Sequence, residues 1–367
     1  MNSLPLGVYV HFPWCVKKCP YCDFNSHPLK GALAEAEYVD ALLADISASA
    51  TDFESCTVIT VFFGGGTPSL FSPRAFEQVL SALPGDPIEV TLEANPGTTE
   101  YHDFADYRRA GINRLSLGAQ SFSDRALERL GRIHKAEETV RAFERARSAG
   151  FDNINLDLMY GLPEQNTDEA IEDLDKAIRL NPEHISWYEL TLEPKTEFFR
   201  RPPKLPDEDT MASLEDAGRL LLTSAGYQRY EVSAWSRPGR ACAHNLNYWR
   251  FGDYAGIGAG AHGKLTRAGS VRRTTRPAQP RIFMADPRSS TSTTVAPSRL
   301  RFEYLLNILR LPEGCAFDDL LAATGLTTSA LEPEWGKGVA AGLLRADRIA
   351  TTATGYRYLD EVMQAFL

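Results

Sequence analysis

The sequence predicts an α/β protein built around a parallel sheet, because short apolar runs alternate with amphipathic stretches from residue 7 to about 190. Six apolar runs occur in this order: GVYVHF, TVITVFF, IEVTLEA, INRLSLGA, FDNINLDLMYG and HISWYEL. The stretches between them include AEYVDALLADISA and AEETVRAFERARSAG, and the second ends in the glycine that often stops a helix. Six such βα units predict an open, partial (β/α)6 barrel, since a closed barrel of this kind usually has eight.

Length and composition are those of a soluble globular protein with two or three domains. The chain has 367 residues, of which 43% are hydrophobic and 24% charged. It contains no run of the roughly 20 apolar residues that span a membrane, and its first ten residues lack the features of a signal peptide. We therefore expect a cytoplasmic protein. The net charge of -9 argues against nucleic acid as a partner, and the basic segment RAGSVRRTTRP (267–277) is expected to be a mobile, solvated hairpin.

Changes in composition divide the chain into three expected domains: residues 1–193 with the barrel, an α+β extension over 194–290, and a small unit over 291–367. The extension begins with the proline-rich PKTEFFRRPPKLP and continues with an expected helix (DTMASLEDAGRLLLTSAG) and an expected strand (YQRYEVSAW). The segment from about 277 to 300 is expected to be a loop or linker. The last unit, ending in LLRADRIATTATGYRYL, is winged-helix-like in pattern, but a fold alone does not assign DNA binding.

Three of the six cysteines lie close together, in HFPWCVKKCPYCDFN, with the spacing Cys15-x3-Cys19-x2-Cys22. They follow the first expected strand, where a loop can fold back so that the thiolates converge. Clustered thiolates bind zinc or iron–sulfur centres. Structural zinc normally takes four ligands, so His11 or His27 would have to complete that site. A 4Fe–4S cluster on three cysteines would instead leave one iron open for chemistry.

The other cysteines, Cys56, Cys242 and Cys315, occur singly, and we expect each to be a small buried hydrophobe. Polar and glycine residues gather where the expected strands end: GGGTP after the second, EANPG after the third, GAQSF after the fourth and DLMYGLP after the fifth. In parallel α/β folds this edge carries the active site, so the placement favours function over stability.

The cysteine spacing after a first strand, with Tyr21 before the last cysteine, resembles that of the radical S-adenosylmethionine (SAM) superfamily. The resemblance implies a radical SAM barrel and a 4Fe–4S cluster held by Cys15, Cys19 and Cys22. It also implies that SAM chelates the open iron through its amino and carboxylate groups. In that family the reduced cluster cleaves SAM to a 5'-deoxyadenosyl radical, and the protein positions the cofactor.

The strand-end motifs match the branch of this superfamily that contains the oxygen-independent coproporphyrinogen oxidase HemN and the HemW-type proteins. By resemblance, glycine backbone amides approach the methionyl group, a carboxylate holds ribose hydroxyls, and other side chains surround the nucleoside and carboxylate. The SAM-binding residues implied in this way are Tyr9, Gly65, Gly66, Thr67, Glu93, Gln120, Arg132 and Asp157.

A second glycine-rich segment, GIGAGAHGKL (256–265), fits neither nucleotide-binding pattern that it approaches. A Walker A loop needs Ser or Thr where Leu265 stands, and a dinucleotide fingerprint needs a following helix, which KLTRAGSVRRTTRP does not offer. We expect a glycine-rich turn packed against the barrel, with His262 able to face the cavity.

The segment HNLNYWRFGDY begins at His244 and has two interpretations. From the residues alone, an aromatic core with a histidine at its edge is the favoured one. The segment also resembles the HNxxYW motif of HemW-type heme chaperones, which implies His244 as a heme ligand beside aromatic faces. Charge for the heme propionates is expected from Arg250, Lys264 and the basic stretch 272–276.

The resemblance to HemW-type proteins spans essentially the whole chain and implies a heme chaperone that binds heme and transfers it to apo-hemoproteins. It implies acceptors in the respiratory chain, peripheral association with the inner face of a membrane, and an optional homodimer. The alternative is an oxygen-independent coproporphyrinogen III oxidase. Against it, Phe24 stands where the oxidase pattern has a fourth cysteine, only eight residues precede Tyr9 where the oxidase has a long arm, and HNxxYW belongs to the chaperone branch. Whether the protein is an enzyme is left open, with the balance against it.

Overall fold

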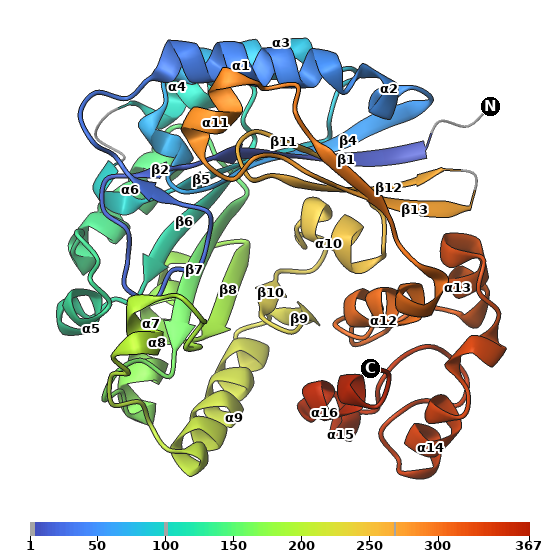
Figure 1. The fold of residues 1–367 in the computed structure, drawn as a ribbon. Coiled ribbons are helices and arrows are strands. Elements are labelled where there is room, and N and C mark those ends of the chain that lie inside the picture. Colours follow the sequence, from blue (N-terminus) through green and yellow to red (C-terminus); the bar gives the residue numbers. More distant parts are fainter. Residues whose placement is uncertain (1–3, 99–101, 268) are drawn as a thin grey trace.

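A single twelve-stranded sheet organises the part of the chain that the computed structural model describes, residues 4–98, 102–267 and 269–367. Its order is β14-β13-β12-β11-β1-β4-β5-β6-β7-β8-β10-β9. The six predicted strands form its parallel centre: β1 (Leu4–Phe12), β4 (Cys56–Gly65), β5 (Glu89–Ala94), β6 (Arg114–Gln120), β7 (Ile154–Tyr160) and β8 (His184–Glu189). The sheet curves like an open barrel (Figure 1), so the predicted partial (β/α)6 architecture is confirmed.

Helices between the parallel strands cover the convex face of this sheet, as α1, α3, α4 and α6 show in Figure 1. The two helices predicted between these strands correspond to α1 and α6, and the helix predicted at DTMASLEDAGRLLLTSAG is also confirmed, as α9 (Glu208–Ser224). The connecting helices are α1 (Glu35–Ala48), α2 (Ala50–Phe53), η1 (Pro68–Leu70), α3 (Pro73–Ala82), η2 (Pro96–Thr98), α4 (Phe104–Arg109), α5 (Asp124–Arg129), α6 (Ala136–Ser148) and α7 (Thr167–Leu180).

Alternation along the strands gives the two faces of the sheet different chemistry. On β1, Val8 and Val10 are fully buried against the helices, whereas Tyr9 and His11 face the inside of the curve. The inside carries many polar side chains, among them Thr60, Glu89, Thr91, Glu93, Arg114, Ser116, Asn155, Asp157, His184 and Ser186. The convex face therefore supplies the hydrophobic core and the concave face is left for polar function.

Residues of the predicted extension, together with the first residues of the predicted C-terminal unit, lengthen the sheet at both ends. At one end β10 (Ala234–Ser236) pairs antiparallel with β8, and β9 (Gln228–Glu231) follows it. At the other end β11 (Asp253–Ile257) pairs parallel with β1 and is followed by the antiparallel strands β12 (His262–Arg267), β13 (Ser270–Thr275) and β14 (Thr291–Thr294). The helices of this region are α8 (Glu197–Arg200), α9 (Glu208–Ser224), α10 (Ala243–Trp249) and α11 (Pro280–Ala285).

Three local predictions in this region were wrong. The segment YQRYEVSAW is a tight hairpin of β9 and β10, and the expected linker from 277 to 300 contains α11 and β14. The basic hairpin is not solvated throughout, because Arg272 pairs with Asp52 and the buried Arg276 pairs with Asp45 on α1. The predicted boundary near 193 stays a prediction, although one hydrophobic core runs from Leu6 to Phe283 across it.

The C-terminal residues form a helical unit with a separate core. It consists of α12 (Pro297–Ile308), α13 (Phe317–Thr324), η3 (Thr328–Leu331), α14 (Glu334–Ala340), α15 (Ala353–Arg357) and α16 (Leu359–Gln364). Leu305, Trp335 and Phe366 lie in its core, which also takes up Phe251 from the loop after α10. Two isolated bridges, Cys315 with Ile349 and Leu344 with Thr351, are its extended pairings. The winged-helix assignment stays a prediction. Among the described residues, no helix has the length and apolar character needed to cross a membrane.

Candidate cluster and cofactor site

A cavity of about 330 Å³ lies at the carboxyl ends of the parallel strands. It is lined by ten of the residues predicted from sequence: Cys15, Cys19, Cys22, Gly65, Gly66, Thr67, Glu93, Gln120, Arg132 and Asp157. They come from the loop after β1 and from the ends of β4, β5, β6 and β7 or the segments that follow them. The expectation that the strand-end motifs meet at one edge is therefore met.

The loop after β1 folds back on itself, which brings its three cysteines to the same cavity. Strands β2 (Trp14–Cys15) and β3 (His27–Pro28) pair within it, and Lys18 donates to the carbonyl oxygens of Phe24 (2.9 Å) and Ser26 (3.1 Å). Asn25 fastens the loop to a distant part of the chain, since its Nδ2 donates to Ala259 O (3.0 Å) and Ala278 O (2.8 Å). These contacts fix the shape of the loop, which forms a cradle at the cavity.

The three thiols of this loop are free and partly exposed to the cavity. Burial raises the pKa of Cys15 and Cys22, so both are neutral thiols at pH 7. Arg132 lies beside the third, with Nη1 at 3.7 Å from Cys19 Sγ. Its position is fixed by Nη2, which donates to Asn95 Oδ1 (2.5 Å) and Gly118 O (2.9 Å).

The donor set fits an iron–sulfur cluster better than a zinc ion. In the described ranges, no three side chains of His, Cys, Asp or Glu are placed to hold a single metal ion. The two histidines considered for zinc are engaged elsewhere: His11 with Tyr9 and Asn25, and His27 with the Asn25 side chain. Three thiols around one open cavity, with a cation beside them, suit a larger anionic cluster.

Gly65 and Gly66, at the end of β4, are needed for close packing rather than for free amides. Gly65 has φ +116°, and a Cβ there would lie 2.5 Å from the His11 ring; a Cβ on Gly66 would lie 2.5 Å from Trp14 O. Their N–H groups already donate within the protein, Gly65 to Glu93 Oε2 (3.1 Å) and Gly66 to Phe12 O (2.7 Å). We predicted that these glycines let backbone amides face SAM. The structure gives a different reason: glycine permits the tight contact between β1 and β4.

Gly66→Ala is accordingly expected to destabilise the protein by about 1 to 3 kcal/mol and to lower cluster content after reconstitution, because backbone atoms of the cysteine loop must move. Thermal unfolding and iron content measure the two effects. The matched control is Gly336→Ala on the exposed face of α14, where a Cβ meets only the end of the flexible Glu332 side chain. Equal behaviour of the two variants would contradict the proposed contact.

Two carboxylates face the cavity from neighbouring parts of the sheet. Burial, and the nearby Asp157, raise the pKa of Glu93 to about 8. Burial also raises the pKa of Asp157, against hydrogen bonds from Ser116 Oγ (2.8 Å) and Asn155 Nδ2 (2.9 Å). A cationic ligand would favour the ionised form of both groups, so the pair is suited to a positively charged small molecule.

Further residues of the cavity were not singled out from sequence. Asn95 lies within the quoted EANPG motif, and its Nδ2 donates to Thr67 Oγ1 (2.8 Å). Ser116 and Met159 lie within strands, and Tyr188 and Glu189 end β8. For Asn95 the position after β5 was a usable signal. For Tyr188 there was none, because HISWYEL carries no glycine or polar cluster at its end.

Two predicted residues lie outside the cavity lining. Tyr9 lies beneath it, with its hydroxyl bonded to His11 Nδ1 (3.0 Å) and its ring stacked on Phe62. His244 lies deeper, 1% exposed, and both ring nitrogens are engaged, Nδ1 with Thr60 Oγ1 (2.8 Å) and Nε2 with Tyr248 OH (3.2 Å). Burial lowers the pKa of His244 to about 3, so the ring is neutral.

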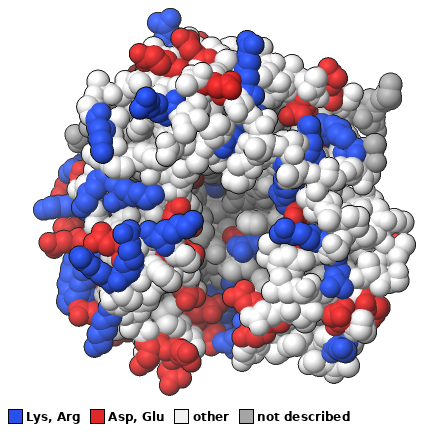
Figure 2. Space-filling model, in the orientation of Figure 1, with Lys and Arg blue, Asp and Glu red and all other residues white. Residues whose placement is uncertain are grey.

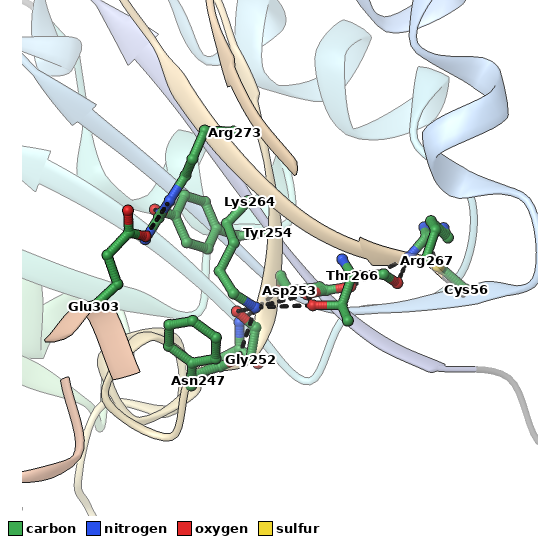
Figure 3. A network of polar contacts seen from close by, with 11 residues as sticks. Cys56, Asn247, Gly252, Asp253, Tyr254, Lys264, Thr266, Arg267, Arg273 and Glu303 are labelled. Carbon is green, nitrogen blue, oxygen red and sulfur yellow. Dashed lines mark hydrogen bonds and ion pairs between the residues drawn. The ribbon is translucent and has the colours of Figure 1, made fainter. Parts of the chain in front are cut away.

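Lys264, Arg272, Arg273 and Arg276, four of the cations expected to face heme propionates, are paired within the fold. Arg250 is exposed, and its part in heme binding stays a prediction. Lys264 is 2% exposed and its Nζ donates to Asp253 Oδ1 (2.8 Å) and Phe251 O (2.8 Å), as part of the network in Figure 3. In the same figure Arg273 binds Glu303 on α12 and the Tyr254 hydroxyl. Through Arg273 on β13 this network is joined to Glu303 of the C-terminal unit, so the expectation that Lys264 and Arg273 supply charge to a ligand was wrong.

Exposed cations gather elsewhere. Figure 2 shows Lys and Arg over the left of that view, the side on which Figure 1 places α5 and α8, and a deep hollow at the centre of the same face. Exposed basic residues of the cysteine loop and of the segment around α8 are Lys17, Lys18, Lys195, Arg200, Arg201 and Lys204. The two segments touch, because Phe198 N donates to Pro20 O (3.0 Å).

Comparison with known proteins bears on both the site and the whole chain. The sequence pattern of the radical SAM superfamily matches residues 9–177. The heme chaperone HemW of Escherichia coli K12 is 47% identical over 372 aligned residues, covering 99% of this chain and 98% of that protein. HemW of Mycobacterium tuberculosis H37Rv is 35% identical, covering 100% and 96%. Among solved structures, coproporphyrinogen III oxidase HemN of E. coli, a radical SAM enzyme, superimposes with a TM-score of 0.83 at 21% identity, covering 100% of this chain and 91% of that one.

Proposed function

Because this chain belongs to the HemW family of the radical SAM superfamily, we propose that it binds heme and transfers it to apo-hemoproteins. It carries a 4Fe–4S cluster on Cys15, Cys19 and Cys22, with an exchangeable SAM on the open iron. The observation that supports the chaperone assignment most is the 47% identity over 98% of a heme chaperone's length. Phe24 supports it as well, since this side chain, 60% exposed at the edge of the cavity, replaces the fourth cysteine of the oxidase pattern.

The cavity residues divide the work of holding the cofactor. Bound SAM supplies a 5'-deoxyadenosyl radical when the cluster is reduced. Arg132 places a positive charge at Cys19 and so favours the anionic cluster. Glu93 and Asp157 offer negative charge to the sulfonium and hydrogen-bond acceptors to hydroxyl groups. Thr67 and Gln120 line the cavity beside them. Tyr9 lies next to Glu93, since both side chains adjoin Gly64.

Heme ligation by His244 stays part of the proposal, but it requires a conformational change. Its ring is buried between Phe62 and Tyr248, so iron reaches it only if α10 moves or Tyr248 swings away. The exposed cations near α8 can pair with the two heme propionates. Lys264 cannot, because it is buried and already paired with Asp253.

The proposal extends to partners and location. Acceptors are apo-hemoproteins of the respiratory chain, met at the inner face of a membrane by a cytoplasmic protein that associates peripherally, alone or as a homodimer. The alternative function is oxidative decarboxylation of coproporphyrinogen III. The observation in its favour is the shared fold with HemN.

One experiment separates these two functions. The reconstituted, reduced protein is incubated anaerobically with SAM and coproporphyrinogen III, and porphyrins and 5'-deoxyadenosine are quantified by mass spectrometry. We expect no decarboxylated product from protein with a verified cluster, and saturable binding when the same protein is titrated with heme. Decarboxylation over multiple turnovers would establish the oxidase instead, and absence of heme binding would contradict the chaperone.

His244→Ala is expected to shift the Soret band and to weaken heme binding, because it removes the proposed axial ligand. The control is His262→Ala, which removes an exposed histidine outside the motif. Thermal unfolding is recorded for both, since loss of the buried ring also removes packing against Phe62. A folded His244→Ala protein with unchanged heme spectrum and affinity excludes this residue as the ligand.

A further inference from the structure

A chain of hydrogen bonds crosses the inside of the barrel from helix α10 to Asp157. Asn245 Nδ2 lies 3.5 Å from Tyr230 OH, and Tyr230 OH lies 2.8 Å from His184 Nε2. His184 Nδ1 lies 2.6 Å from Asn155 Oδ1. Asn155 Nδ2 lies 2.9 Å from Asp157 Oδ1. The chain joins β7, β8, β9 and α10, and it ends on a carboxylate of the cofactor cavity.

The donors and acceptors of this chain fit only one arrangement. Asn155 Oδ1 accepts from the Ser186 backbone N–H (3.0 Å), so the oxygen faces His184 and the NH2 faces Asp157. His184 must then carry its proton on Nδ1, which leaves Nε2 to accept from the Tyr230 hydroxyl. Burial lowers the pKa of His184, which keeps the ring neutral as this arrangement requires. Each donor therefore points toward Asp157, and such aligned bonds strengthen one another.

Burying these polar side chains costs folding free energy, so we expect the arrangement to serve a function. Asn155 is 2% exposed and His184 is fully buried, in a layer where apolar side chains of similar size would pack without any polar group to satisfy. Ser116 completes the hold on the carboxylate: its Oγ accepts from Asn155 Nδ2 (2.7 Å) and donates to Asp157 Oδ2 (2.8 Å). Both oxygens of Asp157 are thus oriented from inside the protein.

The end of the hydrogen-bond chain at Asn245, on α10, is also held in place. Helix α10 lies within the curve of the sheet (Figure 1), and its first amides, Ala243 N and His244 N, each donate to the buried carboxylate of Glu89 at 2.9 Å. His244 anchors the helix to Thr60 on β4. The motif helix therefore has a structural use that does not depend on heme.

We propose that Asn155, His184, Tyr230 and Asn245 are positioning residues for SAM, which orient the Asp157 carboxylate through this chain of hydrogen bonds. The inference rests on the proposed SAM site and adds to it the role of the HNxxYW helix as its base.

The test measures SAM affinity by calorimetric titration of anaerobically reconstituted protein with matched iron content. Tyr230→Phe removes only the hydroxyl, and Asn155→Leu removes the donor to Asp157. We expect roughly a threefold weaker Kd for the first and roughly tenfold or more for the second, in keeping with loss of one remote and one direct buried hydrogen bond. His184→Asn, whose amide N–H can replace Nδ1–H, is expected to bind SAM more tightly than His184→Leu.

Tyr227→Phe is the matched control, because it also removes a buried tyrosine hydroxyl, which donates to Pro182 O (2.7 Å) outside the chain. It should lose similar stability and keep the wild-type Kd. The EPR spectrum of the reduced cluster, with and without SAM, gives a second readout that a general loss of stability does not move. Wild-type Kd in folded Tyr230→Phe and His184→Leu would overturn the inference alone. Wild-type protein with an intact cluster that does not bind SAM would overturn the proposed SAM site, and the inference with it.

Discussion

Cys19→Ala is expected to abolish the iron–sulfur cluster while leaving the protein folded. A cluster with only three protein ligands has no spare thiolate, so removing one leaves two, which do not retain four irons. Cys19 is partly exposed, and its sulfur contacts Arg132 and Tyr21. Arg132 keeps its bonds to Asn95 and Gly118 in the variant, so alanine leaves little unsatisfied inside the protein. After anaerobic reconstitution, iron and sulfide content and the visible absorbance should fall to near background.

Cys56→Ala is the matched control for this experiment. Cys56 is also a free, half-buried cysteine, although it lies at the start of β4, where its sulfur accepts from Arg267 (3.2 Å; Figure 3). It should reconstitute like the wild type. A Cys19→Ala protein with a full 4Fe–4S spectrum would refute the assignment of the loop, and loss of the cluster in both variants would make the effect non-specific.

SAM binding is expected to tighten with rising pH up to about 8 and then to level off. Burial, followed by repulsion from Asp157, raises the pKa of Glu93 to about 8, so its carboxyl group is protonated in the ligand-free protein at lower pH. A ligand with a sulfonium charge favours the ionised form, and binding therefore releases a proton. For one such group the affinity changes by up to about tenfold per pH unit.

The stability of the ligand-free protein should change in the opposite direction. The folded-state pKa of Glu93 lies above its ordinary value of 4.5, so its contribution is fully present below pH 4.5 and is lost as pH rises to about 8. Glu93→Gln should weaken SAM binding and flatten both pH profiles, leaving a residual slope from Asp157. Calorimetric titration and thermal unfolding between pH 5.5 and 8.5 measure them. Glu128→Gln, an exposed change on α5, should leave both unaltered, and an equally flat profile in wild type would contradict the assignment.

The parts of the fold that sequence predicted are those governed by local pattern. Apolar runs that alternate with amphipathic stretches located all six parallel strands. The common direction of parallel strands then required the motifs after β4, β5, β6 and β7 to meet at one edge. The cysteine loop followed from spacing alone. None of these inferences needed to know which distant segments pair.

The parts that sequence missed depend on long-range contacts. Strand β11, DYAGI, is short and contains glycine, and only its place beside β1 makes it a strand. Lys264 carries a charge that suggested the surface, but Asp253 and two backbone carbonyls satisfy it in the interior. The bonds from Asn245 through Tyr230 to Asn155 join residues far apart in sequence, so no local sequence pattern predicts them.

The attachment of the cysteine loop to residues 259 and 278 also has a consequence for biosynthesis. Asn25 emerges from the ribosome about 250 residues before its partner Ala278. Strand β1 is likewise synthesised nearly 250 residues before β11, with which it pairs. At typical elongation rates this interval is on the order of ten seconds or more. Until then β1 presents an open edge that invites pairing with other chains, and the cradle for the cluster is incomplete. Iron is therefore best delivered after translation, to a chain that is already almost whole.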